Sequence, residues 1–397
     1  MTKKLYYDDV YQTKFSSKVI KRNNDESGCF VVLQETAFYP TGGGQPFDKG
    51  TLNEINVLKV EEVDGEIRHY METSIDMEEV NGVIDWERRF DHMQQHAGQH
   101  ILTAAFEDNL GYKTLSFHLG EETCTIDLDT SFLTDEEIHK AEKLANKIIL
   151  ENRPILTKWV DKKEELSGLP LRKELAVSEH IRLVIIPEYD YNGCGGTHPR
   201  STGEVSLLKI LTCEKQKKYT RVHFVCGGRL LKQLQEKQEV LKKLTTQLSS
   251  PQQEIDKAVN RLLQHTKSLE ERIVNMQDQL LQFEGKELLE KVEKINGYNM
   301  IHSVFHNRTI NELQLLAKEI VEGNKNTIVL FVNDDQNKLQ VVCARSEDIE
   351  FNLNQLLKGV LPSINGKGGG KPSFVQGGGE RNILPEVLLD QLIKGLS

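Results

Sequence analysis

The pattern of apolar and polar residues divides the chain into four parts. Over residues 1–88, short alternating runs such as 29–33 are separated by turn residues at 23–25 and 64–65. This pattern predicts strands that close into a small N-terminal β-barrel domain. Over residues 89–228, helical and strand patterns are mixed, which predicts an α+β core. Its expected elements are strands at 124–128, 181–186 and 221–226, a helix carrying residues 96–106, and a helix over 134–152 with a capping box from Thr134 and Glu137.

Residues 229–285 carry apolar side chains at helical spacing, with a four-three repeat over 255–283. Ser250 as N-cap, Pro251 at the first helical position and Gln253 completing a capping box predict that the helix restarts after a turn. We therefore expect a helical hairpin linker of two antiparallel helices. A dimeric coiled coil is the alternative.

Residues 286–397 alternate between strand and helix patterns, which predicts a compact C-terminal α/β domain. The expected elements are at 300–305, 313–321, 328–332, 339–344, 349–357 and 384–393. The segment 366–373 is superficially similar to a phosphate-binding P-loop. It is one residue short between its glycines, and Pro372 stands where Ser or Thr should coordinate magnesium, which excludes an NTPase.

Composition narrows the class of protein. A chain of 397 residues is too long for one ordinary core, so a mixed α+β protein of several domains is expected. Its 6 cysteines lack the spacing of a small disulfide framework and indicate reduced thiols in a cytoplasmic protein. The first residues contain no apolar signal core, and no apolar run is long enough to span a membrane.

The net charge of −10 argues against binding to nucleic acid, but the charges are unevenly distributed. Between Lys209 and Lys243 there are ten Lys and Arg residues and three Glu. This excess is either a solvated helix face or a contact for a polyanion. The candidate RNA-binding residues are Lys215, Lys217 and Lys218, with Lys367 and Lys371 in the glycine-rich C-terminal segment.

Two distant motifs together supply four metal ligands. His96 and His100 lie four residues apart on the expected helix, which places both imidazoles on one face. Cys194 and His198 flank two glycines and a threonine, and the glycines allow the backbone to turn tightly. Three imidazoles and a thiolate suit one zinc ion per chain. Because no Glu follows His96, the general base of the HExxH peptidases is missing.

A glycine-rich loop precedes these motifs. Three consecutive glycines between Pro40 and Pro46 exclude a helix or a central strand, so the bare backbone of the loop can face a ligand. Gln45 adds a side-chain donor and an acceptor beside that backbone.

The three motifs FYPTGGGQ, HAGQH and CGGTH, in this order, resemble the editing domain of alanyl-tRNA synthetases and the free-standing AlaX alanyl-tRNA editing proteins. The similarity covers about residues 1–228. The segments GGGKP (368–372) and QGGG (376–379) resemble the C-terminal DHHA1 domain shared with the DHH phosphoesterases, whose catalytic aspartate motif is not evident here. Together these features are similar to the long AlaX form.

The resemblance implies a zinc-dependent deacylase that hydrolyses tRNA(Ala) mischarged with serine or glycine and spares Ala-tRNA(Ala). It implies zinc at His96, His100, Cys194 and His198, and Gln45 in the aminoacyl pocket beside Gly43 and Gly44. Alanine is smaller than serine, so the pocket must reward the serine hydroxyl, for which Thr41, Gln45 and the zinc are the candidates. Four protein ligands are also typical of structural zinc, so a non-catalytic zinc-stabilised RNA-binding protein is the alternative. A homodimer through the helical or C-terminal domain is a further expectation.

Overall fold

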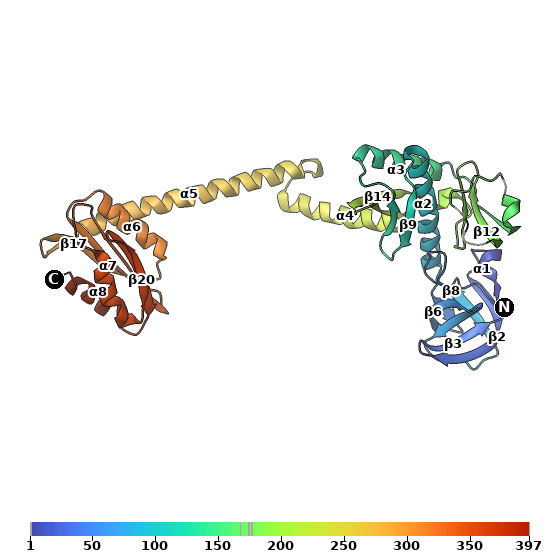
Figure 1. Cartoon of the computed structure of the whole chain (residues 1–397), viewed down its shortest axis with the longest axis horizontal. Coiled ribbons are helices and arrows are strands. Elements are labelled where there is room, and N and C mark those ends of the chain that lie inside the picture. Colours follow the sequence, from blue (N-terminus) through green and yellow to red (C-terminus); the bar gives the residue numbers. More distant parts are fainter. Residues whose placement is uncertain (1, 167, 174, 176–177, 397) are drawn as a thin grey trace. The chain divides into compact units, whose positions relative to one another are not determined.

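The computed structural model describes residues 2–166, 168–173, 175 and 178–396, and divides into two compact units, residues 1–244 and 245–397 (Figure 1). Both units combine helices with sheets, which confirms the predicted mixed α+β, multidomain architecture. The finer division at residues 88, 228 and 285 remains a prediction. Among the described residues, every helix is too short or too polar to cross a lipid bilayer.

The first unit begins with six antiparallel strands that form a closed barrel. Alternate residues point inward, as in the last strand, where Val80 and Ile84 are buried and Glu79 and Val83 are exposed. The short helix α1 (Leu5–Asp8) adds Leu5 and Tyr6 to the barrel core. The order around the barrel is β2 (Lys14–Asp25), β3 (Gly28–Leu33), β7 (Glu66–Met71), β6 (Ile55–Val63), β5 (Gly50–Leu52) and β8 (Glu79–Ile84), and β1 (Lys3–Lys4) pairs with β4 (Glu35–Thr36) outside it.

The long helix α2 (Trp86–Leu110) follows the barrel and forms the centre of the α+β core. It starts because the Asp85 side chain accepts a hydrogen bond from the Arg88 backbone N–H, and it ends at Gly111, which adopts a φ of 72°. Every residue from His92 to Phe106 is buried. The helix therefore carries its polar side chains into the interior, where they need partners.

Helix α2 and helix α3 (Asp135–Leu150) pack on a four-stranded antiparallel sheet. The predicted capping box of Thr134 and Glu137 is present at the start of α3, and the predicted strands at 124–128, 181–186 and 221–226 are confirmed. A second sheet of three strands lies after α3. The strand orders are β14 (Leu208–Lys215), β15 (Thr220–Cys226), β10 (Cys124–Leu128) and β9 (Thr114–Leu119) in one sheet, and β11 (Leu156–Lys162), β12 (Glu179–Ile186) and β13 (Asp190–Gly193) in the other.

A buried ion pair joins the barrel to α2. Arg89 is 1% exposed, and its Nε lies 2.9 Å from both carboxylate oxygens of Asp48, which follows the glycine-rich loop. The same guanidinium donates to the carbonyl oxygens of Val10 and Ala37. These bonds hold the glycine-rich loop next to the helix that carries His96 and His100.

Helix α4 (Gly227–Leu248) runs from the first unit into the start of the second, and helix α5 (Ile255–Leu289) belongs to the second unit. The helix does restart after residue 250, but the predicted capping box is wrong. Pro251 instead leads into a short 3₁₀ turn (Gln252–Glu254), and α5 begins without a side-chain cap. The Ser250 hydroxyl stands outside that turn, buried and without a hydrogen-bond partner among the described residues. The antiparallel packing of the two helices remains a prediction.

The second unit is a six-stranded sheet covered on both faces. Strand β18 (Thr327–Asp334) is buried throughout. Its residues Ile328, Leu330 and Val332 face helices α7 (Leu353–Val360) and α8 (Pro385–Lys394), whereas Val329 and Phe331 face α5 and α6 (Ile310–Glu322). Strands β17 and β18 are parallel, and the other neighbours are antiparallel. The strand order is β16 (Glu293–Ile295), β17 (Tyr298–His306), β18 (Thr327–Asp334), β19 (Lys338–Arg345), β21 (Phe374–Glu380) and β20 (Lys367–Lys371), and the helices are α6 (Ile310–Glu322), α7 (Leu353–Val360) and α8 (Pro385–Lys394).

Candidate metal centre

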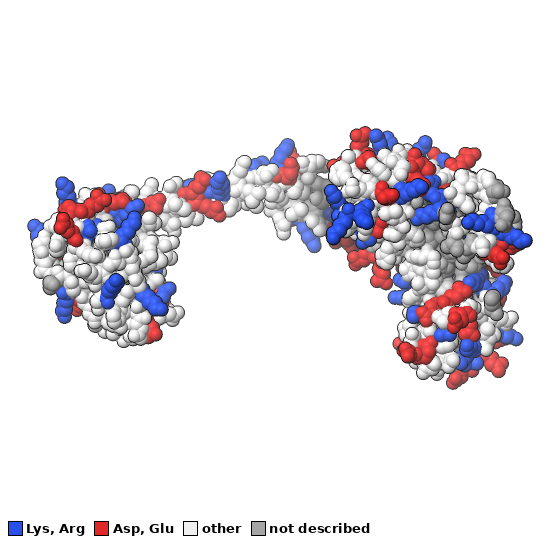
Figure 2. Space-filling model, viewed as in Figure 1, with Lys and Arg blue, Asp and Glu red and all other residues white. Residues whose placement is uncertain are grey.

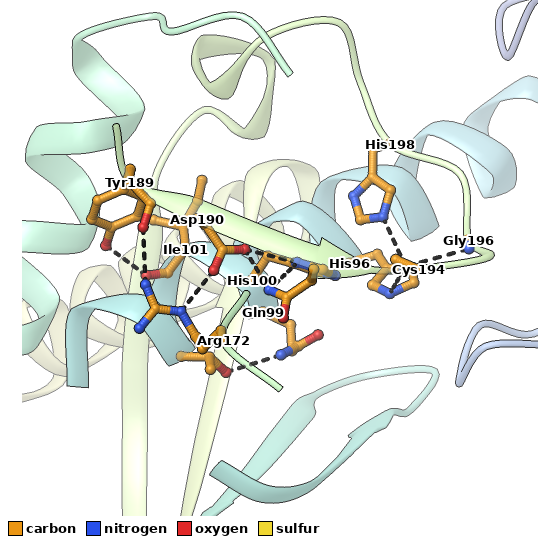
Figure 3. Close-up of polar contacts among 12 residues, drawn as sticks. His96, Gln99, His100, Ile101, Arg172, Tyr189, Asp190, Cys194, Gly196 and His198 are labelled. Carbon is orange, nitrogen blue, oxygen red and sulfur yellow. Dashed lines mark hydrogen bonds and ion pairs between the residues drawn. The ribbon is translucent and has the colours of Figure 1, made fainter. Parts of the chain in front are cut away.

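The four predicted ligands meet in the first unit (Figure 3). His96 and His100 project from consecutive turns of α2, and Cys194 and His198 come from the loop that follows β13. Their ligand atoms all lie within 4.8 Å of one another. The Nε2 atoms of His96 and His198 lie 3.4 and 3.3 Å from Cys194 Sγ. In a tetrahedral zinc site a sulfur and a nitrogen ligand lie about 3.6 Å apart, so the donor set fits zinc.

Gly196 explains why the CGGTH motif contains glycine between its ligands. A Cβ at this position would lie 2.2 Å from Cε1 and 2.3 Å from Nδ1 of His96. Any side chain would therefore push the loop away from α2. The glycine allows a loop and a helix that are distant in sequence to bring their ligands together.

The outer nitrogens of two ligands have fixed partners. His100 Nδ1 lies 3.0 Å from Asp190 Oδ2, and His96 Nδ1 lies 3.1 Å from Gln45 Oε1. Asp190 is itself held by Arg172, whose Nε lies 2.7 Å from Asp190 Oδ1. Because each Nδ1–H donates outward, each Nε2 is left free to coordinate a metal. These contacts support the interpretation of the group as a metal centre.

The electrostatics of the group differ among the ligands. Cys194 and His198 favour the forms that bind zinc. At His100, burial lowers the pKa but hydrogen bonds to Asp190 and Cys194 raise it to about 10, so that a zinc ion would have to displace a proton there. Burial by itself would raise the pKa of the Cys194 thiol, but charge interactions with His96 and His198, and hydrogen bonds from His100 and His198, hold that pKa well below its usual value. Burial, together with the charge of His96, lowers the pKa of His198 to about 3. A thiolate and a neutral imidazole are the forms that bind zinc.

A cavity of about 690 Å³ opens beside the four-residue group. His96, His100 and Cys194 form part of its wall, and Gly43 and Gly44 of the glycine-rich loop form another part. Trp159 on β11 also lines the cavity and is 53% exposed. Its indole packs edge to face against Tyr7, with ring centroids 5.4 Å apart. The remaining polar lining includes Gln99, Thr103, Ser116, Lys173, Arg182 and Asn192.

Two residues predicted to act on the substrate lie elsewhere. Gln45 is 1% exposed and is absent from the described cavity lining. Its Oε1 accepts a hydrogen bond from the Thr197 backbone N–H at 3.0 Å, and its Nε2 donates to Thr197 Oγ1 at 2.8 Å. Gln45 therefore braces His96 and Thr197 together. Thr41 is exposed, and the described lining does not include it either.

The candidate RNA-binding lysines are all exposed. Lys215 ends β14, and Lys217 and Lys218 lie in the turn before β15. Lys367 and Lys371 stand at the two ends of β20. Figure 2 shows Lys and Arg interspersed with Asp and Glu over the face drawn, rather than gathered into one positive surface. A contact with RNA on this face would therefore be local.

The sequence interpretation missed Asp190, Arg172, Trp159 and Gln99. Gln99 stands inside the HAGQH motif, so the motif itself offered a signal. Asp190 and Arg172 reach the centre only because β13 and the loop before β12 fold against α2, and nothing in their sequence spacing indicates this.

Asp190 gives a testable prediction about metal affinity. Replacing it with asparagine removes the charge that orients His100 and should weaken zinc binding by about ten- to a hundredfold, as outer-sphere changes at zinc sites do. Competition with a chromogenic chelator measures this affinity. Asp127→Asn is the matched control, because Asp127 is also a buried carboxylate paired with an arginine (Arg221) but contacts none of the four ligands. Equal zinc affinities for the two variants would contradict the role of Asp190.

Comparisons with known proteins agree with this site. Three family models match the chain: tRNA synthetases class II (A) over residues 1–88, the threonyl and alanyl tRNA synthetase second additional domain over 181–223, and the DHHA1 domain over 297–395. The second of these covers Cys194 and His198. The third covers residues 297–395 of the second unit, which are therefore a C-terminal DHHA1 domain.

Full-length relatives settle the family. The chain is 33% identical to the alanyl-tRNA editing protein AlaX-L of Pyrococcus horikoshii, over 100% of this chain and 98% of that protein. It is 30% identical to the alanyl-tRNA editing protein Aarsd1-B of Xenopus laevis, over 98% and 97%. The alanine–tRNA ligase of Pyrococcus abyssi is 31% identical over 95% of this chain but only 42% of its own length. The chain therefore belongs to the family of alanyl-tRNA editing proteins, in the long form that carries a DHHA1 domain.

Proposed function

We propose that the protein is a trans-editing hydrolase that deacylates Ser-tRNA(Ala), and also Gly-tRNA(Ala), while sparing Ala-tRNA(Ala). The observation that carries this proposal is the cavity of about 690 Å³ that includes three of the four ligand residues in its wall. Full-length similarity to proteins named for alanyl-tRNA editing identifies the class of substrate. A purely structural zinc site would not require an adjoining cavity.

The residues around the centre have separable roles. His96, His100, Cys194 and His198 would hold one zinc ion, which supplies Lewis acidity toward a carbonyl oxygen or a water. Gln45 and Asp190 orient the two imidazoles of α2. An aminoacyl ester is already activated, so its hydrolysis depends mainly on positioning and on stabilising the oxyanion.

The cavity also suits the nucleoside that carries the ester. A serine alone would fill only a small part of it. The exposed indole of Trp159 offers a face on which a base can stack, and Lys173 adds positive charge to the same lining. An aminoacyl group joined to a terminal adenosine therefore matches both the size and the chemistry of the space.

Deacylation assays test the proposal. Purified protein should release serine from Ser-tRNA(Ala) at least about a hundred times faster than alanine from Ala-tRNA(Ala), well within the discrimination of about 10⁴–10⁵ that hydroxyl-reading sites achieve. A chelator should abolish the activity, and added zinc should restore it. If the protein binds zinc and tRNA but deacylates none of the Ser-, Gly- and Ala-tRNA(Ala) species, the alternative of a non-catalytic zinc-stabilised RNA-binding protein is favoured instead.

Binding of tRNA should depend on the candidate lysines. Changing Lys215, Lys217 and Lys218 to glutamine should lower the slope of log affinity against log salt by about one unit for each phosphate that the protein no longer neutralises. The measurement is filter binding of tRNA(Ala) at several salt concentrations. The control variant changes three exposed barrel lysines, Lys14, Lys18 and Lys49. Identical slopes in both variants would exclude the proposed binding of RNA by these lysines, and the same design applies to Lys367 and Lys371.

We retain two further predictions about the whole protein. A role in translation places it in the cytoplasm. A homodimer would use the helical or DHHA1 part, where Leu262, Ile273 and Leu280 of α5 are 55%, 55% and 66% exposed. Sedimentation of the full chain measures the oligomeric state.

A further inference from the structure

Gln99 lies between the two histidine ligands of α2, and only one end of its side-chain amide has a hydrogen-bond partner among the described residues. It is 5% exposed and lines the cavity beside His96 and His100. Its Nε2 donates to Thr103 Oγ1 at 2.9 Å (Figure 3). Its Oε1 is buried and has no hydrogen-bond partner among the described residues. The residue therefore brings to the cavity wall a buried acceptor that no described residue satisfies.

The discrimination of serine from alanine requires such an acceptor. Serine differs from alanine by one hydroxyl, and alanine fits every space that serine fits. Exclusion by size therefore cannot spare alanine, and the site has to gain free energy from the hydroxyl. An acceptor already bonded to water would merely exchange one partner for another, whereas a buried unpaired acceptor gains a bond outright.

The two residues first expected to contact the hydroxyl do not line the cavity. The Gln45 amide is occupied by His96 and Thr197, and Thr41 is exposed outside the described lining. We propose that Gln99 is the residue that reads serine, with Gln99 Oε1 accepting a hydrogen bond from the hydroxyl of the seryl group. This inference rests on the proposed function, since it assigns a specificity residue to that same cavity.

Neighbouring hydroxyls fix the position of the amide. Thr103 Oγ1, which receives the bond from Gln99 Nε2, also lies 3.1 Å from the buried Thr114 Oγ1. This short chain of bonds anchors the nitrogen end of the amide. With the nitrogen end held, Oε1 is the end of the amide that has no partner among the described residues and can bond a ligand in the cavity that Gln99 lines.

The direct test replaces Gln99 with methionine, which keeps the length of the side chain and removes the acceptor. The kcat/KM of the Gln99→Met variant for Ser-tRNA(Ala) should fall by about ten- to a hundredfold, and its kcat/KM for Ala-tRNA(Ala) should change by less than about threefold. Zinc content should stay the same. Gln94→Met is the matched control, because Gln94 is a buried glutamine of α2 that bonds Glu204 O and is absent from the described lining.

A binding measurement separates this inference from the proposed function. Calorimetry with 3′-(L-seryl)amino-3′-deoxyadenosine and its alanyl counterpart, whose amide bonds resist hydrolysis, reports recognition without catalysis. Wild type should prefer the seryl compound, and Gln99→Met should lose about tenfold or more of that preference. If the binding preferences follow this expectation but the protein deacylates none of the tRNA species, the proposed function is wrong, whereas the recognition of serine by Gln99 is still supported.

Two results would overturn the inference. One is an unchanged serine-to-alanine ratio in Gln99→Met; the other is an equal fall in both rates, which indicates a merely structural role. Should Gln99→Met fail to fold, Thr103→Val decides the matter. It releases the amide from its anchor and should lower the serine preference by about threefold or more, and an unchanged preference in that variant equally overturns the inference.

Discussion

Replacing Cys194 with alanine is expected to remove stoichiometric zinc and to lower deacylation of Ser-tRNA(Ala) by at least about a hundredfold. The thiolate is the one anionic donor among the four ligands, and Nε2 of both His96 and His198 lies within 3.4 Å of it. Loss of an outer-sphere partner at a zinc site already costs about ten- to a hundredfold, so loss of a ligand should cost at least as much. Elemental analysis and single-turnover deacylation measure the two effects.

The matched control is Cys29→Ala. Cys29 is a free cysteine of the same intermediate burial, but it lies on β3 of the barrel. This variant should retain one zinc per chain and full activity. Full zinc occupancy in Cys194→Ala would exclude Cys194 as a ligand. Retained activity in a zinc-free protein would instead exclude zinc dependence.

Replacing Arg89 with methionine is expected to lower the free energy of unfolding of the first unit by about 3–5 kcal/mol. The change leaves the Asp48 carboxylate, which is 0% exposed, without its counter-charge. The carbonyls of Val10 and Ala37 also lose their donor. Both tryptophans, Trp86 and Trp159, belong to the first unit, so their fluorescence in urea follows that unit.

Arg200→Met provides the comparison for this stability measurement. Arg200 pairs with Asp9 at 3.2 Å, but their side chains are 69% and 50% exposed. Exposed pairs of this kind contribute at most about 1 kcal/mol. If both substitutions lower stability equally, burial of the Arg89–Asp48 pair has no special importance.

The sequence predicted the ligand group because short motifs encode local geometry. Four-residue spacing on α2 places His96 and His100 on one face. The glycines before His198 indicate that the backbone of this loop approaches another part of the chain closely. The role of Gln45 could not be read in this way. A glutamine beside three glycines can point its amide in many directions, and only the docking of the barrel on α2 turns it toward His96.

The glycine-rich C-terminal segments show the same limit. They contain no apolar alternation and look like loops, yet they form the paired strands β20 and β21. A Cβ at Gly368 would lie 2.4 Å from Gln376 O, so glycine there reflects close approach of two backbones rather than a turn. Composition cannot distinguish these two uses of glycine, because the difference depends on what lies opposite.

The position of Gln45 also limits how the protein can be divided. This residue belongs to the loop between β4 and β5, and it bonds at once to His96 on α2 and to Thr197 beside the last ligand. A gene fragment that begins after the barrel would encode all four ligands and still leave His96 Nδ1 and the Thr197 amide without their buried acceptor. A truncated variant that keeps an ordered metal centre must therefore retain about the first ninety residues, although none of them is a metal ligand.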